Sequence, residues 1–446
     1  MKIIIAGAGD MGFHLAELLS YENQDIVLID NSQEVLDYAS SHLDVLTIRG
    51  DSASSRILEQ SDVEDADLLL AVTTSETTNL ITAMLAKKMG ARQTVARVAR
   101  PEYIEPTQKE IFRQLGVDSV MSPHDLAAEE IRRLVRQCSF TDVFEFEDGK
   151  INLVGVSVTD SSRLLGKKVG DFRTWDREVT LKPIAILRGA LTIIPETDTL
   201  LQRNDHVYFL ADHDNICKVE ELAGAQKTRV RNIMIVGSTP LALATAKRLE
   251  KDYNVTLIEK DKGRCRELSE ELNSTLIING DSGNIDLLEE EGLDNTDVFI
   301  ALTPNSETNI ITSLTAKSRG VAKTIAQVEN KEYIHLSHEI GVDTLINKKL
   351  IAANNIFRFV RKGKIEAITS LHGVDAEVIE FVLHKQNQLT RKPLRSLPFP
   401  KTALVGGVIR GDKGILPNGD FQLEVNDKVI VFALPEAIGK VEQLFR

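Results

Sequence analysis

The chain carries the same pattern twice, and this repeat constrains the fold more than any other feature. A shift of about 230 residues superimposes the two copies. The matching landmarks are Gly7 with Gly237, Gly50-Asp51-Ser52 with Gly280-Asp281-Ser282, Thr73 with Thr303, Asn79 with Asn309, Glu102-Tyr103 with Glu332-Tyr333 and, after a slip of one residue, Asp30 with Glu259. A single core rarely grows beyond roughly 250–300 residues. A chain of 446 residues built from two copies therefore predicts several domains.

The first half of each copy alternates between strand and helix patterns. In the first copy we expect strands at 2–6, 25–30, 44–48, 67–72 and 93–98, and helices at 11–21, 32–41, 54–61 and 77–89. Runs such as Leu68-Leu69-Leu70-Ala71-Val72 are apolar at every position, which is typical of parallel strands covered on both faces. The pattern predicts an α/β fold with a Rossmann-like, doubly wound parallel sheet in each copy.

The second half of each copy is richer in alternating strand patterns. The first copy predicts strands at 151–158, 183–188, 191–195 and 205–210, a hairpin turn at Gly189 and a helix at 214–223. The second copy predicts strands at 376–384, 403–410, 414–417 and 427–433 and a helix at 435–445. The second half of each copy is therefore expected to be a small α+β subdomain. Plain dimerisation is its simplest role, and binding of an ion or small ligand is the alternative.

Between the two halves lies a connecting helix. Ser122 is a good N-cap, Pro123 suits the first helical position and Asp125 completes a capping box, so a helix is expected from there to about Cys138. It could be a packing helix or a connector. The predicted domains are 1–121 and 229–347 (Rossmann-like), 122–140 and 348–364 (connector helices), and 141–225 and 365–446 (C-terminal subdomains), with the polar stretch 225–229 as the main linker.

A glycine-rich turn follows the first predicted strand, and the pattern predicts a separate job for each glycine. In Gly7-Ala8-Gly9-Asp10-Met11-Gly12, the first glycine permits a tight turn, the second lets the backbone approach a pyrophosphate and the third lets the helix pack closely on the sheet. The helix N-terminus offers free N–H groups and partial positive charge to phosphates. Asp30 ends the second predicted strand, near the expected spacing for a carboxylate that binds a ribose hydroxyl.

Further candidates follow the other strands of the sheet. Asp51 could accept a hydrogen bond from an adenine amino group, Arg97 could pair with a phosphate, and Thr73 and Thr74 could line the distal end. Ser75 or Thr77 is also a candidate helix cap. The best supported parts recognise an adenosine diphosphate moiety, which NAD, NADH, ADP and ATP share. Asp30, with no arginine adjacent in sequence, disfavours NADP.

The second copy departs from this pattern. Only the first glycine survives in Gly237-Ser238-Thr239-Pro240-Leu241-Ala242. Thr239 has a Cβ where a phosphate should approach, and Pro240 lacks an N–H group. Glu259 retains the acidic residue, so Ser238 and Glu259 stay candidate contacts in a site that we expect to be degenerate for a dinucleotide.

The composition of the chain argues against several classes of function. A net charge of −13 disfavours nucleic acid and anionic membrane surfaces as partners, and no apolar run approaches the ~20 residues that span a bilayer. Three separated cysteines and a first segment without a basic region favour a cytosolic protein. His335 and His338 are the only histidine pair with helical spacing, and further metal ligands are missing, so no metal site is predicted. No catalytic constellation is visible, which favours a sensor, with an NAD-dependent oxidoreductase as the alternative.

The full set of motifs resembles the RCK domain, a regulator of potassium conductance. The resemblance rests on Gly7, Gly9, Gly12 and Asp30, on Gly50-Asp51, on the Thr73-Thr74 turn with Asn79, on Ala96-Arg97-Val98 and on the 144–224 module, and it covers both copies. It implies a non-enzymatic regulatory subunit that binds NAD(H) and ADP/ATP in the first repeat. It also implies a homotetrameric ring of eight RCK domains, cytoplasmic and held at the membrane by a potassium-translocating subunit of the TrkH or TrkG type.

Overall fold

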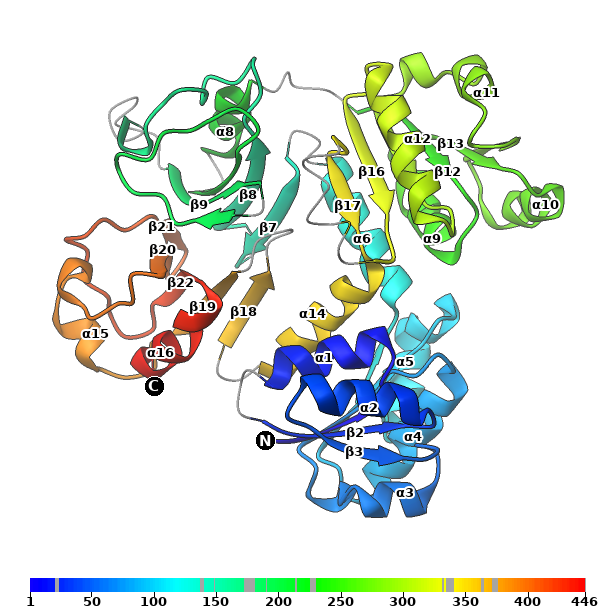
Figure 1. Ribbon diagram of the computed structural model, residues 1–446, viewed down its shortest axis with the longest axis horizontal. Helices are drawn as coiled ribbons and strands as arrows, with labels where there is room; N and C mark the ends of the chain where they lie inside the picture. Colours follow the sequence, from blue (N-terminus) through cyan, green and yellow to red (C-terminus); the bar gives the residue numbers. More distant parts are fainter. Residues whose placement is uncertain are drawn as a thin grey trace. The chain divides into compact units, whose positions relative to one another are not determined.

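The computed structural model contains two compact units (Figure 1). Unit 1 comprises Met1–Glu129 and Asn347–Val360, and unit 2 comprises Glu130–Ile346 and Arg361–Arg446. The structure describes residues 1–20, 24–136, 140–147, 149–171, 181–189, 191–212, 215–224, 230–330, 333, 341–361, 365–370 and 376–445. The expected linker 225–229 and the His335–His338 pair lie outside these ranges.

Unit 1 is built on a six-stranded parallel sheet in the order β3-β2-β1-β4-β5-β6. Its strands are β1 (Lys2–Ala6), β2 (Asp25–Asp30), β3 (Leu46–Arg49), β4 (Leu68–Ala71), β5 (Gln93–Arg97) and β6 (Ser119–Met121). The first five confirm the expected strands. β6 is a three-residue strand that the sequence pattern was too short to reveal.

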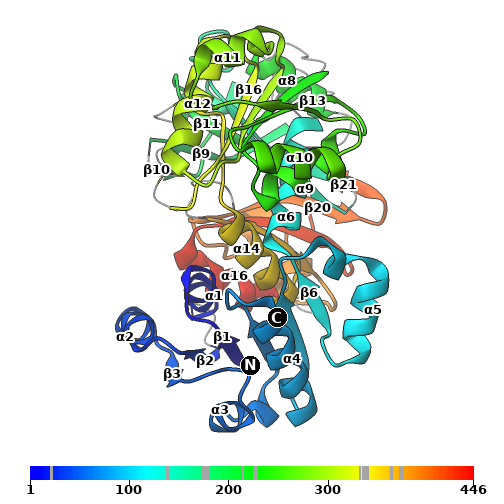
Figure 2. The same cartoon turned by 90° about the vertical axis from the view of Figure 1, so that its right-hand side faces the viewer.

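Helices cover both faces of this sheet. They are α1 (Asp10–Ser20), α2 (Gln33–His42), α3 (Ser55–Gln60), α4 (Glu76–Met89) and α5 (Pro106–Gln114). α1 and α2 lie on one face and α4 and α5 on the other (Figure 2). Leu58, Ala83 and Phe112, from α3, α4 and α5, share one buried core with the sheet residues Ile4 and Leu69. The continuous apolar strands therefore have the two-sided burial that their sequence predicts.

Unit 1 also contains a helix from the second copy. α6 (Pro123–Arg136) and α14 (Lys348–Arg361) are the two connector helices. Ser122 Oγ accepts a hydrogen bond from the backbone N–H of Asp125 at 3.3 Å, which confirms the expected N-cap of α6. Residues Lys348 to Val360 of α14 belong to unit 1, whereas α6 passes from unit 1 into unit 2 at Glu130. Each unit is thus composed of residues from both copies.

Unit 2 contains the second Rossmann-like sheet, in the order β14-β13-β12-β15-β16-β17. Its strands are β12 (Asn232–Val236), β13 (Asn254–Glu259), β14 (Leu276–Asn279), β15 (Val298–Ala301), β16 (Lys323–Gln327) and β17 (Thr344–Ile346). Its helices are α9 (Pro240–Leu249), α10 (Lys262–Glu271), α11 (Ile285–Glu290) and α12 (Ser306–Ser318). The strand order matches that of unit 1, as the repeat predicts.

The two C-terminal subdomains each form a five-stranded sheet. The first has the order β10-β9-β11-β8-β7, with β7 (Asp142–Phe146), β8 (Ile151–Ser157), β9 (Leu181–Arg188), β10 (Leu191–Ile193), β11 (His206–Asp212) and helix α8 (Ile216–Ala223). The second has the order β18-β19-β22-β20-β21, with β18 (Ile365–Ser370), β19 (Glu377–Val382), β20 (Ala403–Arg410), β21 (Lys413–Ile415), β22 (Lys428–Ala433) and helices α15 (Gln388–Arg391) and α16 (Pro435–Phe445). β7, β18 and α15 are additional to the predicted elements.

These two sheets pack against each other within unit 2. Ile151, Tyr208, Ile430 and Phe432 belong to one buried core that draws on both subdomains. A Cβ at Gly407 would lie 2.8 Å from Ile151 Cδ1, so the glycine permits the close approach. Lys428 Nζ pairs with Glu147 at 2.6 Å, and Lys150 Nζ with Asp412 at 3.1 Å. The subdomains therefore pair within one chain.

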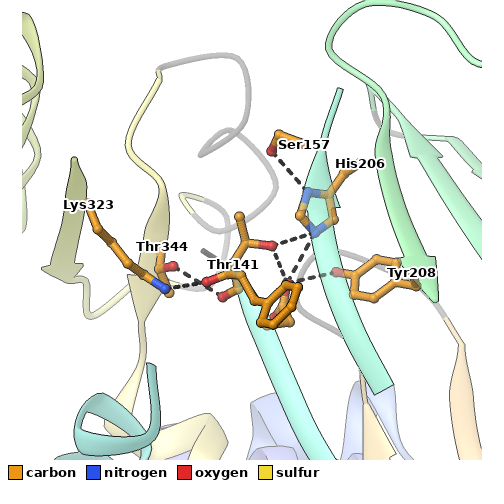
Figure 3. Close-up of polar contacts among 8 residues, drawn as sticks. Thr141, Ser157, His206, Tyr208, Lys323 and Thr344 are labelled. Atoms are coloured by element: carbon orange, nitrogen blue, oxygen red, sulfur yellow. Dashed lines mark hydrogen bonds and ion pairs between the residues drawn. The ribbon is translucent and has the colours of Figure 1, made fainter. Parts of the chain in front are cut away.

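A buried polar cluster in unit 2 surrounds the start of β7 (Figure 3). His206, 1% exposed, lies 2.8 Å from the Thr141 hydroxyl, 3.2 Å from Asp142 Oδ2 and 3.2 Å from the Ser157 hydroxyl. Tyr208 donates to Asp142 at 3.3 Å, and burial together with that carboxylate raises the pKa of Tyr208 well above its usual value.

The segment that leads from α6 into β7 is tied to the second Rossmann-like sheet by Lys323 and Thr344 (Figure 3). The buried ammonium of Lys323, on β16, donates to the carbonyl oxygen of Phe140 and to that of Leu134, the latter at 3.2 Å. Thr344, on β17, donates to the carbonyl oxygen of Thr141 at 3.2 Å. Since Leu134 lies in the last turn of α6, the lysine binds the negative end of that helix dipole.

Candidate functional site

The turn between β1 and α1 places its three glycines in different environments. Gly7 has φ +107°, and a Cβ there would lie 2.8 Å from the backbone nitrogen of Thr73. A Cβ on Gly12 would overlap the carbonyl oxygen of Gly7, whereas a Cβ on Gly9 would meet no atom within 4 Å. Gly7 therefore serves the turn, Gly12 serves helix packing, and Gly9 borders open space at the α1 N-terminus.

Asp30 is fixed beside this turn. Its Oδ2 accepts a hydrogen bond from the backbone N–H of Ala8 at 2.7 Å, and its Oδ1 accepts one from the N–H of Ser32 at 2.9 Å. The carboxylate is half-buried at the end of β2 and already oriented. Ala8 and Met11 are buried, so their contribution to a ligand site is limited to backbone groups, while Asp10 is exposed.

The sheet register brings the other candidates to the same edge. Ala6 pairs with Ile29 on β2 and with Ala71 on β4, so β1 and β4 lie side by side although α1 leads away to β2. This is the topological switch point where doubly wound sheets bind ligands. The carboxyl ends of these strands carry Gly7, Asp30, Asp51, Thr73, Thr74 and Arg97.

Asn79 links the carboxyl ends of β4 and β5 by hydrogen bonds to Thr73 and Arg97. Its side-chain oxygen accepts from the Thr73 backbone N–H at 2.9 Å and from the Thr73 hydroxyl at 2.6 Å. Its amide nitrogen donates to the carbonyl oxygens of Thr73 and Arg97 at 3.0 and 2.9 Å. The Thr73 hydroxyl therefore already donates its hydrogen bond to Asn79. Ser75 caps α4 by accepting from the Thr78 N–H at 3.2 Å, which decides between the two expected caps. Thr74 is exposed.

Two basic residues near the turn escaped the sequence analysis. Arg49 lies opposite Asp30 in the β2–β3 register, and its Nε donates to the carbonyl oxygen of Asn31 at 3.3 Å. The strand pairing thus supplies an arginine near Asp30 that is not adjacent in sequence, and the Asp30 carboxylate is the remaining feature that disfavours the 2′-phosphate of NADP. Lys349, from α14, places its Nζ 2.7 Å from Asp10 Oδ2.

In the second copy, side chains of the protein itself bind the backbone groups of the turn between β12 and α9. Gly237 keeps the turn, with φ +99° and the same close approach to Thr303. The Thr239 hydroxyl donates to the Leu302 carbonyl at 2.9 Å and accepts from the Ala242 N–H at 3.2 Å, so it caps α9. Arg264 donates to the carbonyl oxygen of Ser238 at 3.1 Å.

The acidic residues Glu259 and Asp281 of the second copy also have partners within the protein. Glu259 accepts from the Asp261 backbone N–H at 2.7 Å, as Asp30 accepts from Ser32. Lys260 pairs with Asp281, the counterpart of Asp51, at 2.7 Å. The hydrogen bond from Lys260 lowers the pKa of Asp281 and raises that of the lysine.

Membrane-spanning helices and metal sites are the two other features considered for the described ranges. None of the helices there has the length and apolar character needed to cross a membrane. Nor do three or more His, Cys, Asp or Glu side chains gather in a group that could hold a metal ion. The glycine turn of unit 1, with its open space, helix N-terminus and oriented carboxylate, remains the strongest candidate for binding an adenine nucleotide.

Comparison with known proteins agrees with this architecture. The TrkA-N domain matches residues 3–123 and 233–348, and the TrkA-C domain matches residues 153–224 and 378–446. Among solved structures, the GsuK channel bound to NAD aligns with a TM-score of 0.60 at 16% identity, covering 100% of this chain and 78% of that one. The crystal structure of the GsuK RCK domain gives a TM-score of 0.59 at 16% identity and covers 100% and 94%. These likenesses establish the RCK fold.

Full-length relatives identify the family. The chain is 33% identical over 456 residues to Trk system potassium uptake protein TrkA homolog 1 of Methanosarcina mazei, with 100% of both chains covered. It is 34% identical over 448 residues to the TrkA homolog of Archaeoglobus fulgidus, again over 100% of both. It is 32% identical over 453 residues to TrkA of Halomonas elongata, covering 100% of this chain and 99% of that one. The chain therefore belongs to the TrkA family of Trk system potassium uptake proteins.

Proposed function

We propose that this chain is the nucleotide-sensing regulatory subunit of a Trk-type potassium uptake system. It binds NAD(H) and ADP or ATP at one shared site in the first repeat. It works in the cytoplasm, on the inner face of the membrane, where a translocating subunit of the TrkH or TrkG type holds it. It has no catalytic turnover of its own.

The contrast between the two glycine turns is the observation that carries the proposal. In the first copy, Gly9 borders open space and Asp30 is oriented by two backbone N–H groups. In the second copy, the Thr239 hydroxyl takes the helix N–H group that a phosphate would need. The free turn belongs to the first repeat, so the first repeat is where we place the nucleotide.

The choice of ligands follows from shared chemistry. An open turn at a helix N-terminus accepts a pyrophosphate, and a carboxylate at the end of β2 accepts a ribose hydroxyl. NAD(H), ADP and ATP all supply both groups. The fold relative named above was solved with NAD bound, which supports NAD(H) as one ligand.

Regulation would work through differential binding. A ligand shifts a conformational equilibrium only if it binds one state better than the other. NAD(H), ADP and ATP place different charge at the same turn, so they can favour different states. A coupling free energy of about 1–3 kcal/mol would change transport roughly 5–150-fold. A homotetramer would supply eight RCK units, which is the number that the resemblance to RCK domains implies for a ring.

A competition titration of the full-length chain tests the shared site. NADH fluorescence is measured while ADP or ATP is added, and we expect each nucleotide to displace NADH completely. Simultaneous binding of NADH and ATP at undiminished affinity would refute the shared site. Steady NADH absorbance in the presence of small carbonyl compounds is expected, whereas sustained oxidation would favour an oxidoreductase.

A deletion strain tests the regulatory role. Loss of the chain should impair growth at low external potassium, and the full-length protein should copurify with a potassium-translocating membrane subunit. Light scattering should report a homotetramer. Unchanged potassium uptake in a deletion strain that lacks redundant systems would contradict the proposal.

A further inference from the structure

A lysine from the second repeat lies at the phosphate end of the first-repeat turn. Lys349 is the second residue of α14, and its Nζ lies 2.7 Å from Oδ2 of Asp10. Asp10 directly follows Gly9 and is the first residue of α1. The Asp10 side chain is 77% exposed and the Lys349 side chain 30% exposed. The ion pair is therefore open to solvent, and Asp10 is the direct neighbour of Gly9, which borders free space.

The carboxylate of Asp10 is negatively charged like a ligand phosphate, and it belongs to the first turn of α1. A negative group at a helix N-terminus is stabilised by the helix dipole and by the unpaired N–H groups of the first turn. A nucleotide phosphate bound beside Gly9 would use the same electrostatic environment, and it would repel Asp10. It would also attract Lys349, whose ammonium sits on a flexible stem and is not restricted to one acceptor geometry.

We propose that Lys349 is a phosphate-sensing cation of the first-repeat site and that Asp10 is a built-in competitor for it. When a nucleotide binds, the ammonium exchanges the Asp10 carboxylate for a phosphate oxygen. The inference deepens the proposed function and rests on nucleotide binding at Gly9. The exchange favours ATP and ADP over NADH, because a terminal phosphate carries more negative charge than the internal pyrophosphate of a dinucleotide.

The exchange also explains how the first site can influence the second repeat. Lys349 belongs by sequence to the second copy, and its helix α14 passes from unit 1 to unit 2 at Arg361. A ligand that draws the N-terminal end of this helix toward the turn acts directly on the connector of the other repeat. The second copy thus supplies a contact to the first site while its own turn is filled by Thr239.

Charge-removing variants of the full-length chain test the exchange. Lys349→Gln should weaken ATP and ADP binding about five- to tenfold, which corresponds to one partly exposed charge-assisted hydrogen bond, and should change NADH affinity less than about twofold. Asp10→Asn should tighten ATP binding about threefold or more, and this gain should shrink in the Lys349→Gln background. Lys349→Arg should keep most of the ATP affinity. All differences should diminish at high salt, since the groups are exposed.

The matched control removes a lysine at the other edge of the sheet. Lys88 is exposed in the last turn of α4, just before β5 begins, so Lys88→Gln changes the net charge equally without touching the turn. If Lys349→Gln binds ATP like Lys88→Gln while NADH still binds, the exchange is wrong and the proposed function stands. If Asp10→Asn weakens ATP binding, Asp10 is not a competitor. If the unaltered chain binds no nucleotide, both the proposed function and the exchange fail.

Discussion

Replacing Gly9 with valine should abolish nucleotide binding and leave the fold intact. A Cβ at Gly9 meets no atom within 4 Å, and its backbone is not in the left-handed region, so the free energy of unfolding should change by about 0.5 kcal/mol or less. The added methyl groups fill the space where phosphates approach the α1 N-terminus. Loss of two charge-assisted hydrogen bonds, at about 1.5–3 kcal/mol each, weakens binding by roughly 10²- to 10⁴-fold.

Gly12→Ala provides the opposite case at the same turn. Its Cβ would overlap the Gly7 carbonyl oxygen, which is backbone and cannot rotate away. Overpacking usually costs about 1–3 kcal/mol, and we expect the upper end of that range or more because the helix itself must move. Urea unfolding and NADH fluorescence titration of both variants separate the two effects. A Gly9→Val protein that binds NADH within threefold of the original chain, or a Gly12→Ala protein of unchanged stability, would refute the reasoning.

Four further predictions concern single side chains. Asp30→Ala should weaken NADH binding by about 1.5–3 kcal/mol in calorimetry, and unchanged affinity would remove Asp30 from the ribose site. Thr239→Ala should lower stability by about 1 kcal/mol in urea through loss of the α9 cap, with NADH affinity unaltered. Lys323→Met should lower stability by about 1–3 kcal/mol, because two buried carbonyl groups lose their donor. Burial raises the pKa of Glu250, but hydrogen bonds from residues 273–275 outweigh it and hold the pKa below its ordinary value of 4.5. The ionised form therefore stabilises the fold above that pH, so the difference in melting temperature between the original chain and Glu250→Gln should be full at pH 7 and shrink as the pH falls below 4.5.

The parts of the fold that depend on local pattern were predictable. Apolar runs located the first five strands of unit 1, and the glycine spacing located a turn in which each glycine faces a different constraint. These features depend on residues within about one strand–helix–strand unit, and residues that are close in sequence within such a unit are also close in space. Ser122 was likewise identifiable as a helix cap, and Ser75 was one of two candidate caps, because a cap acts on the next three residues.

Contacts between distant segments were not predictable from one sequence. Arg49 lies opposite Asp30 only because of the strand register, and Lys349 reaches Asp10 across more than 300 positions of the chain. Neither residue stands in a motif. The short strand β6 was missed because three residues are too few to show a period. The pairing of the C-terminal subdomains was foreseeable only as a general role, since glycines such as Gly407 read locally as flexible residues rather than as contact points.

The paired C-terminal subdomains have a consequence for how concentration acts on the protein. Two separate single-repeat chains must meet in solution, and dilution separates them. Here the partners belong to one polypeptide, so their pairing is an intramolecular event. Their pairing is therefore indifferent to expression level, and the two repeats always remain in equal numbers. Only contacts between separate chains respond to dilution, so a cell that makes little of this protein reduces the number of its assemblies without breaking the paired subdomains inside each chain.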